Sequence, residues 1–228
     1  MKTQFYVIHY KKNEYRKAAL TPLLEKAGID PIWYLDYDQE ELNDEILRQY
    51  YTHDLSKFKE RTSGMYPEVD YEGYQGLTLG EISLSIKHIK CMEDLVASDF
   101  DYGVFLEDDV TLNIDKKGIE NYTKQIKGVK WDVIFFGGGF DHSLVADRVV
   151  AKYRDFILVD HPATNCLSSY IMTKEAAKKV LSSLTTICTA FDWELNYHLK
   201  VNNMKVWHTV PYTAGQLSTA GVYECSRL

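Results

Sequence analysis

Residues 102–110, Tyr-Gly-Val-Phe-Leu-Glu-Asp-Asp-Val, join an apolar β-strand pattern to three consecutive carboxylates, Glu107, Asp108 and Asp109. Adjacent negative charges repel one another, so such a cluster at the end of a buried strand needs a compensating positive charge. A divalent cation such as Mg²⁺ or Mn²⁺ prefers carboxylate oxygens and can bridge them to the phosphates of a nucleotide. An acidic run taken alone is more often a solvated turn, so the rest of the chain has to distinguish the two interpretations.

Strand and helix patterns alternate on both sides of this stretch. Strands are expected over residues 4–10, 32–37, 131–136, 166–172 and 205–210, with edge strands within 149–159. Helices are expected over residues 14–27, 39–51, 77–98, 174–183 and 192–201, and residues 114–128 form a helix or a loop. This alternation predicts an α/β sheet layered by helices, which binds ligands beyond the carboxyl ends of its strands. The three carboxylates follow such an end.

The chain is expected to form one domain over residues 1–228, because no linker rich in Pro, Gly or Ser interrupts it. Between residues 52 and 76 the periodic pattern dissolves into charged, Tyr-bearing and Gly-bearing sequence. We interpret this segment as a long loop that serves as a lid or an acceptor-facing element, since loops of that length in compact domains are usually functional or mobile.

Composition excludes several classes of protein. The net charge is −7, with no basic stripe, which argues against a nucleic-acid partner. No apolar stretch approaches the roughly 20 residues of a transmembrane helix, and the start turns polar too soon for a signal peptide. The four cysteines lack CxxC spacing, which argues against zinc and against a disulfide framework. We therefore expect a soluble protein of the cytoplasm, a reducing compartment.

Side chains alternate along a strand, so Glu107 and Asp109 are expected on one side and Asp108 on the other. Asp109 is our first candidate for a metal ligand. Glu107 and Asp108 are candidates for the ribose hydroxyls of a nucleotide or for a metal-bound water, and Glu107 is also a candidate metal ligand. The sequence leaves these two assignments open.

Further candidates lie on predicted helices, and each has a structural alternative. Glu81 and His88 are seven residues apart and share a helix face, so they could act together in one site. Alternatively, Glu81 is a first-turn acid of its helix and His88 is a core histidine. Arg16 could pair with a diphosphate, stack on a base or form a surface salt bridge. Asp192 and Glu194 at a helix start suit either proton transfer or capping. Gly137-Gly138-Gly139 suits close approach to a sugar or phosphate, or a tight turn.

Six segments occur in the order and approximate spacing of the glycosyltransferase family 25 proteins, the lipooligosaccharide and collagen galactosyltransferase type. The matching segments are Arg16 after the first strand, Leu79-Gly80-Glu81-Ile82 with His88, Phe105-Leu106-Glu107-Asp108-Asp109-Val110, Thr164 with Ser169-Tyr170-Ile171-Met172, Ala176-Ala177-Lys178-Lys179-Val180-Leu181, and Phe191-Asp192. The chain departs from the family pattern at Ser83 and Leu84, which replace Gly-Cys, at Lys87, which replaces Ser, and at His9, where Asn is usual.

The resemblance implies a GT-A fold, a Rossmann-like mixed sheet flanked by helices, and a metal-dependent inverting glycosyltransferase. Such an enzyme would use Mn²⁺ or Mg²⁺ and a nucleotide-sugar donor, a UDP-sugar in our interpretation, to move a hexose such as galactose to a glycan or glycoprotein. Asp192 would be the base, with Glu194 as the second candidate. His208, at the end of the last strand, would be a further metal ligand, with a structural histidine as the alternative.

Two other functions fit parts of the same pattern. A sugar nucleotidyltransferase would share the sheet and the metal, but it should have a glycine-rich loop after the first strand, where this chain has His9-Tyr10-Lys11-Lys12-Asn13. A non-catalytic carbohydrate-binding or nucleotide-binding module would keep the fold without turnover.

Overall fold

The computed structural model describes residues 2–66, 71, 73–137, 146–164 and 166–218. The strands of this part of the chain form one ten-stranded mixed sheet: β1 (Thr3–Ile8), β2 (Ile32–Tyr34), β3 (Tyr102–Glu107), β4 (Val110–Leu112), β5 (Val133–Gly137), β6 (Val149–Tyr153), β7 (Phe156–Val159), β8 (Ser169–Thr173), β9 (Val206–Thr209) and β10 (Ala214–Gln216). The helices are α1 (Glu14–Lys26), α2 (Asp44–Tyr50), α3 (Leu55–Thr62), α4 (Leu79–Ala97), α5 (Lys116–Gln125), α6 (Lys174–Ser183) and α7 (Phe191–Val201). The predicted α/β class is confirmed, with a mixed sheet between helices as in a GT-A domain.

The main path of the sheet has the strand order β2-β1-β3-β8-β5-β9-β7-β6. Strand β1 is parallel to β2 and β3, and β5 is parallel to β9, whereas β8 runs antiparallel between β3 and β5. The carboxyl ends of β1, β2, β3 and β5 therefore meet at one edge of the sheet. A ligand of an open α/β sheet is expected at such an edge.

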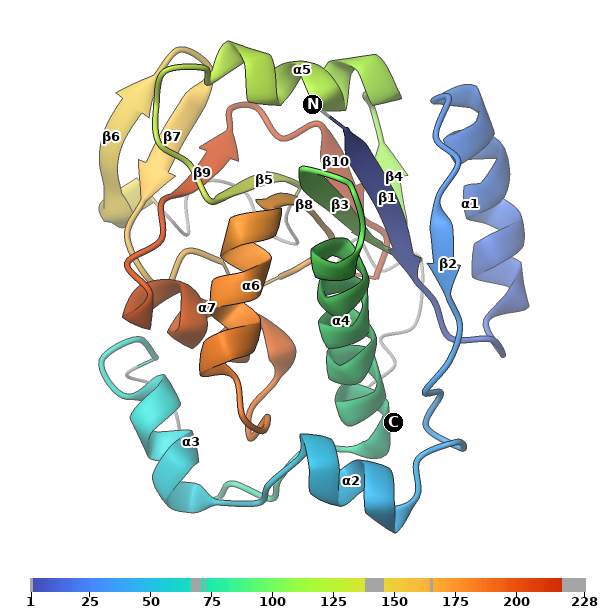
Figure 1. Ribbon diagram of the computed structural model, residues 1–228, viewed down its shortest axis with the longest axis vertical. Coiled ribbons are helices and arrows are strands. Elements are labelled where there is room, and N and C mark those ends of the chain that lie inside the picture. The colour runs from blue at the N-terminus through green and yellow to red at the C-terminus, as the bar shows by residue number, and fades with distance from the viewer. Residues whose placement is uncertain (1, 67–70, 72, 138–145, 165, 219–228) are drawn as a thin grey trace.

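Helices cover both faces of the sheet and give it two apolar layers. Helices α4, α6 and α7 pack on one face, seen in front of the sheet in Figure 1, over a core that includes Tyr6, Phe105 and Tyr170. Helices α1 and α5 pack on the other face, over a core that includes Val7 and Leu106. The central strands β3 and β5 are buried from both sides, which explains why they are apolar without alternation.

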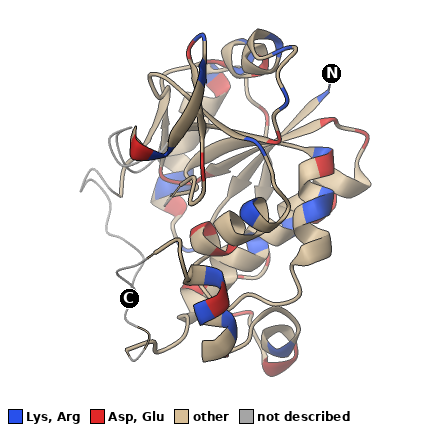
Figure 2. Cartoon of the chain, turned by 90° about the vertical axis from the view of Figure 1, so that its left-hand side faces the viewer, with Lys and Arg blue, Asp and Glu red and all other residues tan. Residues whose placement is uncertain are grey.

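Charged residues are confined mainly to the helices and loops. Figure 2 shows acidic and basic residues interspersed along the helices, whereas the strands at the centre of the sheet are mostly uncharged. Among the described helices, none combines the length and the apolar character needed to cross a membrane.

Side-chain caps set the starts of several helices. Thr78 accepts a hydrogen bond from the backbone N–H of Glu81, and the Glu81 carboxylate accepts one from the backbone N–H of Thr78, which is a capping box at the start of α4. Helix α2 begins at Asp44, later than the predicted residue 39, because the Asn43 side chain accepts from the backbone N–H groups of Glu45 and Ile46.

The prediction of a loop throughout residues 52–76 is wrong. Residues 55–62 form α3, whose cap is Asp54 and whose Phe58 and Thr62 are buried one turn apart. After β9, where no strand was expected, the chain also forms β10, which pairs with β4 and touches β5 at Gly137. Within β5, a Cβ on Gly137 would clash with the Ser169 hydroxyl, so strand packing requires this glycine. Gly138 and Gly139 lie outside the described residues.

Candidate active site

The three carboxylates lie where β3 leaves the sheet. The backbone on either side of them is fixed, because the Glu107 N–H donates to the carbonyl of Ser168 at 3.0 Å and the Asp109 carbonyl accepts from the N–H of Leu217 at 2.9 Å. Val110 then begins β4 and is buried against the α1 and α5 face. The acidic triplet is thus a rigid turn of the fold, and it is not a solvated acidic turn.

Asp108 is held in a buried ion-pair cluster. One of its oxygens lies 2.7 Å from Nδ1 of His9, and the other accepts a hydrogen bond from Nη1 of Arg16 at 2.9 Å. All three side chains are at most 8% exposed. Arg16 is therefore a buried partner of Asp108, unlike the surface salt bridge considered from the sequence. Both oxygens of Asp108 are engaged by the protein itself.

Asp109 has a different environment, although it is the next residue. It is 3% exposed, and its Oδ1 has no hydrogen-bond partner among the described residues. A buried carboxylate oxygen without a partner is costly, because it has lost its hydration without gaining a hydrogen bond. Asp109 therefore keeps a buried oxygen that is available to a ligand.

Glu107 lies near Asp108, Asp109 and the start of helix α7. Its Oε2 accepts from the Gln216 amide at 3.1 Å, and its Oε1 is 3.7 Å from Nε2 of His88. Burial raises its pKa well above the usual value, and the negative charges of Asp109, Asp108 and Asp192 raise it further, against the opposing charge of Arg16. Without a further cation, this environment disfavours the charged form of Glu107.

His88 and Glu81 occupy separate places on α4. His88 is fully buried, stacks on Phe191 at a ring distance of 5.0 Å and lies 3.1 Å from the Tyr170 hydroxyl through Nδ1. Burial lowers its pKa to about 3, so it is a neutral neighbour of Glu107 at physiological pH. The Glu81 carboxylate accepts from the backbone and the hydroxyl of Thr78, each at 2.9 Å, and its observed role is the helix cap.

The two acids at the start of α7, Asp192 and Glu194, also have different surroundings. Asp192 is half-buried, and although the cap position of α7 is Ala190, Oδ1 of Asp192 accepts a hydrogen bond from the backbone N–H of Trp193 at 2.9 Å in the first turn. The negative charge of Asp192 is a minor cause of the raised pKa of Glu107, after burial and the charges of Asp109 and Asp108. Glu194 is fully buried, forms an ion pair with Arg61 of α3, accepts from the backbone N–H of Cys188 at 3.2 Å and lies 3.2 Å from Nε2 of His198. Glu194 thus joins α3 to α7.

His208 does not form a preformed metal site with the acidic triplet among the described residues. It lies on β9, which β8 and β5 separate from β3, and its ring stacks on Phe135 at 5.1 Å. Its Nδ1 lies 2.7 Å from the Tyr212 hydroxyl. Throughout the part of the chain that the structure describes, no three His, Cys, Asp or Glu side chains are grouped as a metal site.

Several residues of this region were not among the candidates from sequence. His9 and Lys87 carried a signal, because both depart from the family pattern, but the sequence did not show that they meet. Asp38 and Arg61 carried none, because the buried charged partner of each, Lys87 and Glu194 respectively, lies 49 residues or more away in the chain.

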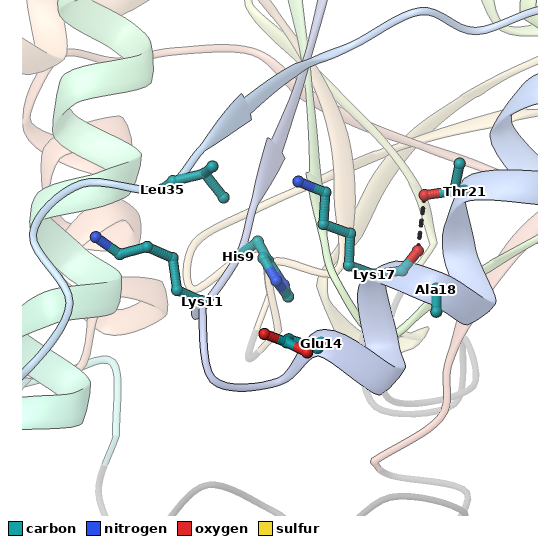
Figure 3. A pocket seen from close by; sticks show the side chains of 7 residues that line it. All are labelled: His9, Lys11, Glu14, Lys17, Ala18, Thr21 and Leu35. Carbon is teal, nitrogen blue, oxygen red and sulfur yellow. Dashed lines mark hydrogen bonds between the residues drawn. The ribbon is translucent and has the colours of Figure 1, made fainter.

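A pocket of about 540 Å³ adjoins the cluster, between α1 and the ends of β1 and β2. Figure 3 shows its lining: His9, Lys11 and Leu35 follow the strands, and Glu14, Lys17, Ala18 and Thr21 project from one face of α1. The ammonium of Lys17 lies 4.8 Å from the centre of the Trp33 ring, and His9 meets the same ring edge-on at 5.5 Å. His9 therefore belongs both to the pocket wall and to the pair with Asp108.

Several solved structures are similar in fold. A protein from STIV is 15% identical, with 91% of this chain and 81% of that chain covered and a TM-score of 0.47. A glycosyltransferase involved in the glycosylation of the major capsid of PBCV-1 is 12% identical, with 80% and 66% covered and a TM-score of 0.35. A mannose-1-phosphate geranyltransferase from Thermus thermophilus is 10% identical, with 92% and 74% covered and a TM-score of 0.43. At these values the similarities say nothing about the reaction.

No curated protein sequence matches the chain significantly. The family model of glycosyltransferase family 25, described as LPS biosynthesis protein, matches residues 2–138. This span contains β1 to β5, the acidic triplet, Arg16 and the pocket, and it is more than half of the chain. The chain belongs to glycosyltransferase family 25.

Proposed function

We propose that the protein is a metal-dependent inverting glycosyltransferase that moves a hexose, with galactose the first candidate, from a UDP-sugar to a glycan or glycoprotein acceptor. The observation that carries the proposal is the buried Asp109, with an oxygen that has no partner among the described residues, beside a Glu107 whose pKa is raised by burial and by the surrounding negative charge. Family membership supports the transfer of a sugar.

The acidic triplet fits a divalent cation. Its donors are hard carboxylate oxygens, and Mg²⁺ or Mn²⁺ in phosphate-binding sites is commonly held by one or two carboxylates together with water and substrate phosphates. Asp109 would be the first ligand and Glu107 the second. When bound, the cation would supply Lewis-acid stabilisation of the diphosphate leaving group.

The pocket between α1 and the strand ends is the place we assign to the donor nucleotide. It lies beside His9, which holds Asp108, and it combines the apolar Leu35 with the ammonium groups of Lys11 and Lys17. In this arrangement Asp108 orients His9 and Arg16, and it does not bind the ribose through a free oxygen. Arg16 adds a positive charge next to the diphosphate.

Asp192 is the base in this proposal, because its charge acts on Glu107 and Glu194 is engaged with Arg61. The acceptor hydroxyl oxygen forms a bond to the anomeric carbon while the bond from that carbon to the diphosphate oxygen breaks. The hydroxyl proton passes to the Asp192 carboxylate. Residues 52–66, which include α3, pack beside α7 and would form part of the acceptor side.

The test is donor turnover with a panel of UDP-sugars and GDP-sugars in the presence of Mn²⁺, Mg²⁺ or EDTA. We expect release of UDP from one UDP-sugar, faster with an added glycan acceptor and lost in EDTA. Binding of a donor without turnover in any condition would identify a non-catalytic module. Release of pyrophosphate from UTP and a sugar phosphate would identify a nucleotidyltransferase.

A further inference from the structure

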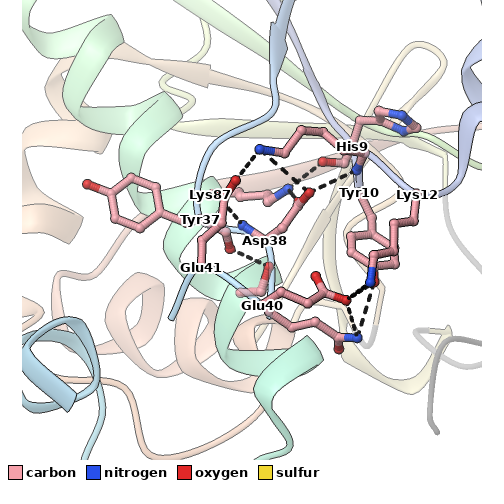
Figure 4. A network of polar contacts seen from close by, with 11 residues as sticks. His9, Tyr10, Lys12, Tyr37, Asp38, Glu40, Glu41 and Lys87 are labelled. Atoms are coloured by element: carbon pink, nitrogen blue, oxygen red, sulfur yellow. Dashed lines mark hydrogen bonds and ion pairs between the residues drawn. The ribbon is translucent and has the colours of Figure 1, made fainter. Parts of the chain in front are cut away.

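Lys87 is a buried cation outside the acidic triplet. It lies on α4, is 2% exposed, and its Nζ donates both to the backbone carbonyl of His9 and to the carboxylate of Asp38 (Figure 4). His9 follows β1 and Asp38 lies in the segment after β2, so one ammonium group ties together two chain segments at the carboxyl edge of the sheet. Lys87 and His9 are thus in direct contact, although 78 residues separate them in the chain.

Asp38 extends this connection toward the pocket. Its second oxygen accepts from the backbone N–H of Lys11 at 3.1 Å, and its own N–H donates to the Glu41 carboxylate at 3.1 Å. Glu41 in turn forms an ion pair with the Lys11 side chain. The segments that carry His9, Lys11 and Leu35 are therefore held relative to each other by groups that converge on Lys87 and Asp38.

The same contacts fix the partner of Asp108. His9 accepts from Lys87 through its backbone and meets Asp108 through its ring, at 2.7 Å. His9, Lys11 and Leu35 also form the strand-end wall of the pocket. A displacement of Lys87 would thus shift one wall of the pocket and change the contacts that Asp108 makes with His9 and Arg16.

We propose that Lys87 is a positioning residue for the donor nucleotide. Through Asp38 and the His9 carbonyl, it holds the ends of β1 and β2 in the arrangement that binds the nucleoside diphosphate. The proposal rests on the proposed function and concerns binding of the donor, whereas Asp192 concerns the acceptor proton. Lys87 itself touches neither donor nor acceptor.

A purely structural ion pair would behave differently. Replacing both members of a buried ion pair by apolar residues of similar volume is often neutral or stabilising, so such a change separates positioning from folding. A binding site needs its side chains within a fraction of an ångström, and its supporting groups determine that precision. The double variant Lys87→Met/Asp38→Leu should therefore fold and bind poorly.

The test is calorimetric titration of UDP in the presence of MnCl₂, with thermal melting and donor hydrolysis on the same preparations. We expect the double variant to melt cooperatively, to bind UDP about tenfold or more weakly, and to raise the donor KM with little change in kcat. The control is Lys90→Met, a lysine of the same helix that pairs with Glu93 and lies over the rings of Tyr37 and Tyr50. It should bind UDP as the unaltered protein does.

Asp38→Asn is the second variant, and it tests the positioning role of Lys87 if the double variant fails to fold. The amide keeps the shape of Asp38 but cannot accept from both Lys87 and the Lys11 N–H, so UDP affinity should fall again. Unaltered UDP affinity in the folded double variant, or in Asp38→Asn, would overturn the positioning role of Lys87 but would leave the proposed function standing. Failure of the unaltered protein to bind any nucleotide with Mn²⁺ would overturn the proposed function and this inference with it.

Discussion

Asp108 and Asp109 are adjacent residues with opposite environments. Asp108 forms an ion pair with Arg16 and lies within hydrogen-bond distance of His9, while Asp109 keeps a buried oxygen without a partner in the described structure. Because the strand leaves the sheet at this point, successive side chains face different elements. This difference supports the proposal that Asp109 binds the cation while Asp108 orients His9 and Arg16, whereas the sequence alone had left the roles of Glu107 and Asp108 open.

For Asp109→Asn we expect loss of metal-dependent donor turnover by about 100-fold or more, because the cation loses its first ligand. The melting temperature should stay the same or rise slightly, since the substitution removes a charge that Glu107 and Asp108 repel. Steady-state hydrolysis and thermal melting measure both effects. Asp99→Asn, an exposed acid just after the end of α4, is the control. Full activity in Asp109→Asn would reject the metal assignment.

For Asp192→Asn we expect kcat for transfer to fall about 100-fold or more while donor affinity changes little, because a base acts on the acceptor proton. The charge of Asp192 also raises the pKa of Glu107, so this variant should lower that pKa. Transfer kinetics and donor titration on the same variant separate the two quantities. Equal losses in affinity and kcat would instead show that Asp192 supports the fold of the site.

His198 gives a prediction about pH. It is fully buried, and burial together with the charge of Arg61 lowers its pKa to about 3 from an ordinary value of 6.5. The unfolded chain therefore binds a proton that the native protein does not, between pH 6.5 and about 3. Stability from this group is complete above pH 6.5 and is lost as the pH falls below it, by about 1.4 kcal/mol per pH unit.

Urea unfolding at pH 7.5 and pH 5.5 tests this sign. The unaltered protein should lose more stability between the two pH values than His198→Gln does. Glu107, whose pKa is raised, acts in the opposite direction, but it is common to both proteins and cancels in the comparison. A larger loss of stability between pH 7.5 and pH 5.5 in His198→Gln than in the unaltered protein would contradict the lowered pKa of His198.

At the scale of the elements, α3 and α7 are joined by a buried pair. Arg61 of α3 contacts Glu194 and donates to the Thr186 carbonyl at 2.8 Å, and Tyr197 donates to Glu60 at 2.6 Å. The rings of Tyr66 and Trp193 stack at 4.2 Å. Residues 55–66 therefore form a fixed support for the helix that carries Asp192.

Arg61→Met should destabilise the protein by about 3–5 kcal/mol, because it leaves the Glu194 charge buried without its cation. The double variant Arg61→Met/Glu194→Gln should recover most of that loss, since no buried charge remains. Urea unfolding of the two single variants and the double variant measures the coupling. Additive losses would show that the two side chains stabilise the protein independently.

At the scale of the whole molecule, the carboxyl edge of the sheet collects charges from distant parts of the chain. His9 and Asp108 are 99 residues apart in sequence, and Arg16 and Asp108 are 92 apart. The site that we propose, which combines the acidic triplet, Asp192 and the lysines beside the pocket, can therefore form only in the folded protein. A ligand that bridges the triplet and the pocket should stabilise the whole fold.

We expect UDP and Mn²⁺ together to raise the melting temperature more than the sum of their separate effects. A ligand at 100 times its Kd stabilises the native state by about 2.7 kcal/mol, and neither component alone occupies both the triplet and the pocket. Differential scanning fluorimetry with Mn²⁺, with UDP, with both and with added EDTA measures this. Additive shifts, or a shift with UDP that EDTA leaves unchanged, would show that the cation is not shared.

Many elements could be predicted from sequence because their causes are local. The apolar run of β3, the capping box of α4 and the periodicity of α6 each depend on residues within a few positions of one another. Helix α3 was missed although Asp54 and the spacing of Phe58 and Thr62 signalled it. Strand β10 has only three residues and exists because β4 offers it a partner, which no local pattern reveals.

By itself, the sequence determined the α/β class, the family and the position of three carboxylates at a strand end, because strand and helix periods and short motifs are written in neighbouring residues. Only the tertiary structure decided that Asp108 is paired, that Glu194 is tied to Arg61 and that Lys87 reaches His9. These contacts join residues that are far apart in the chain. Their charges acquire partners only when the sheet brings its strand ends and flanking helices together.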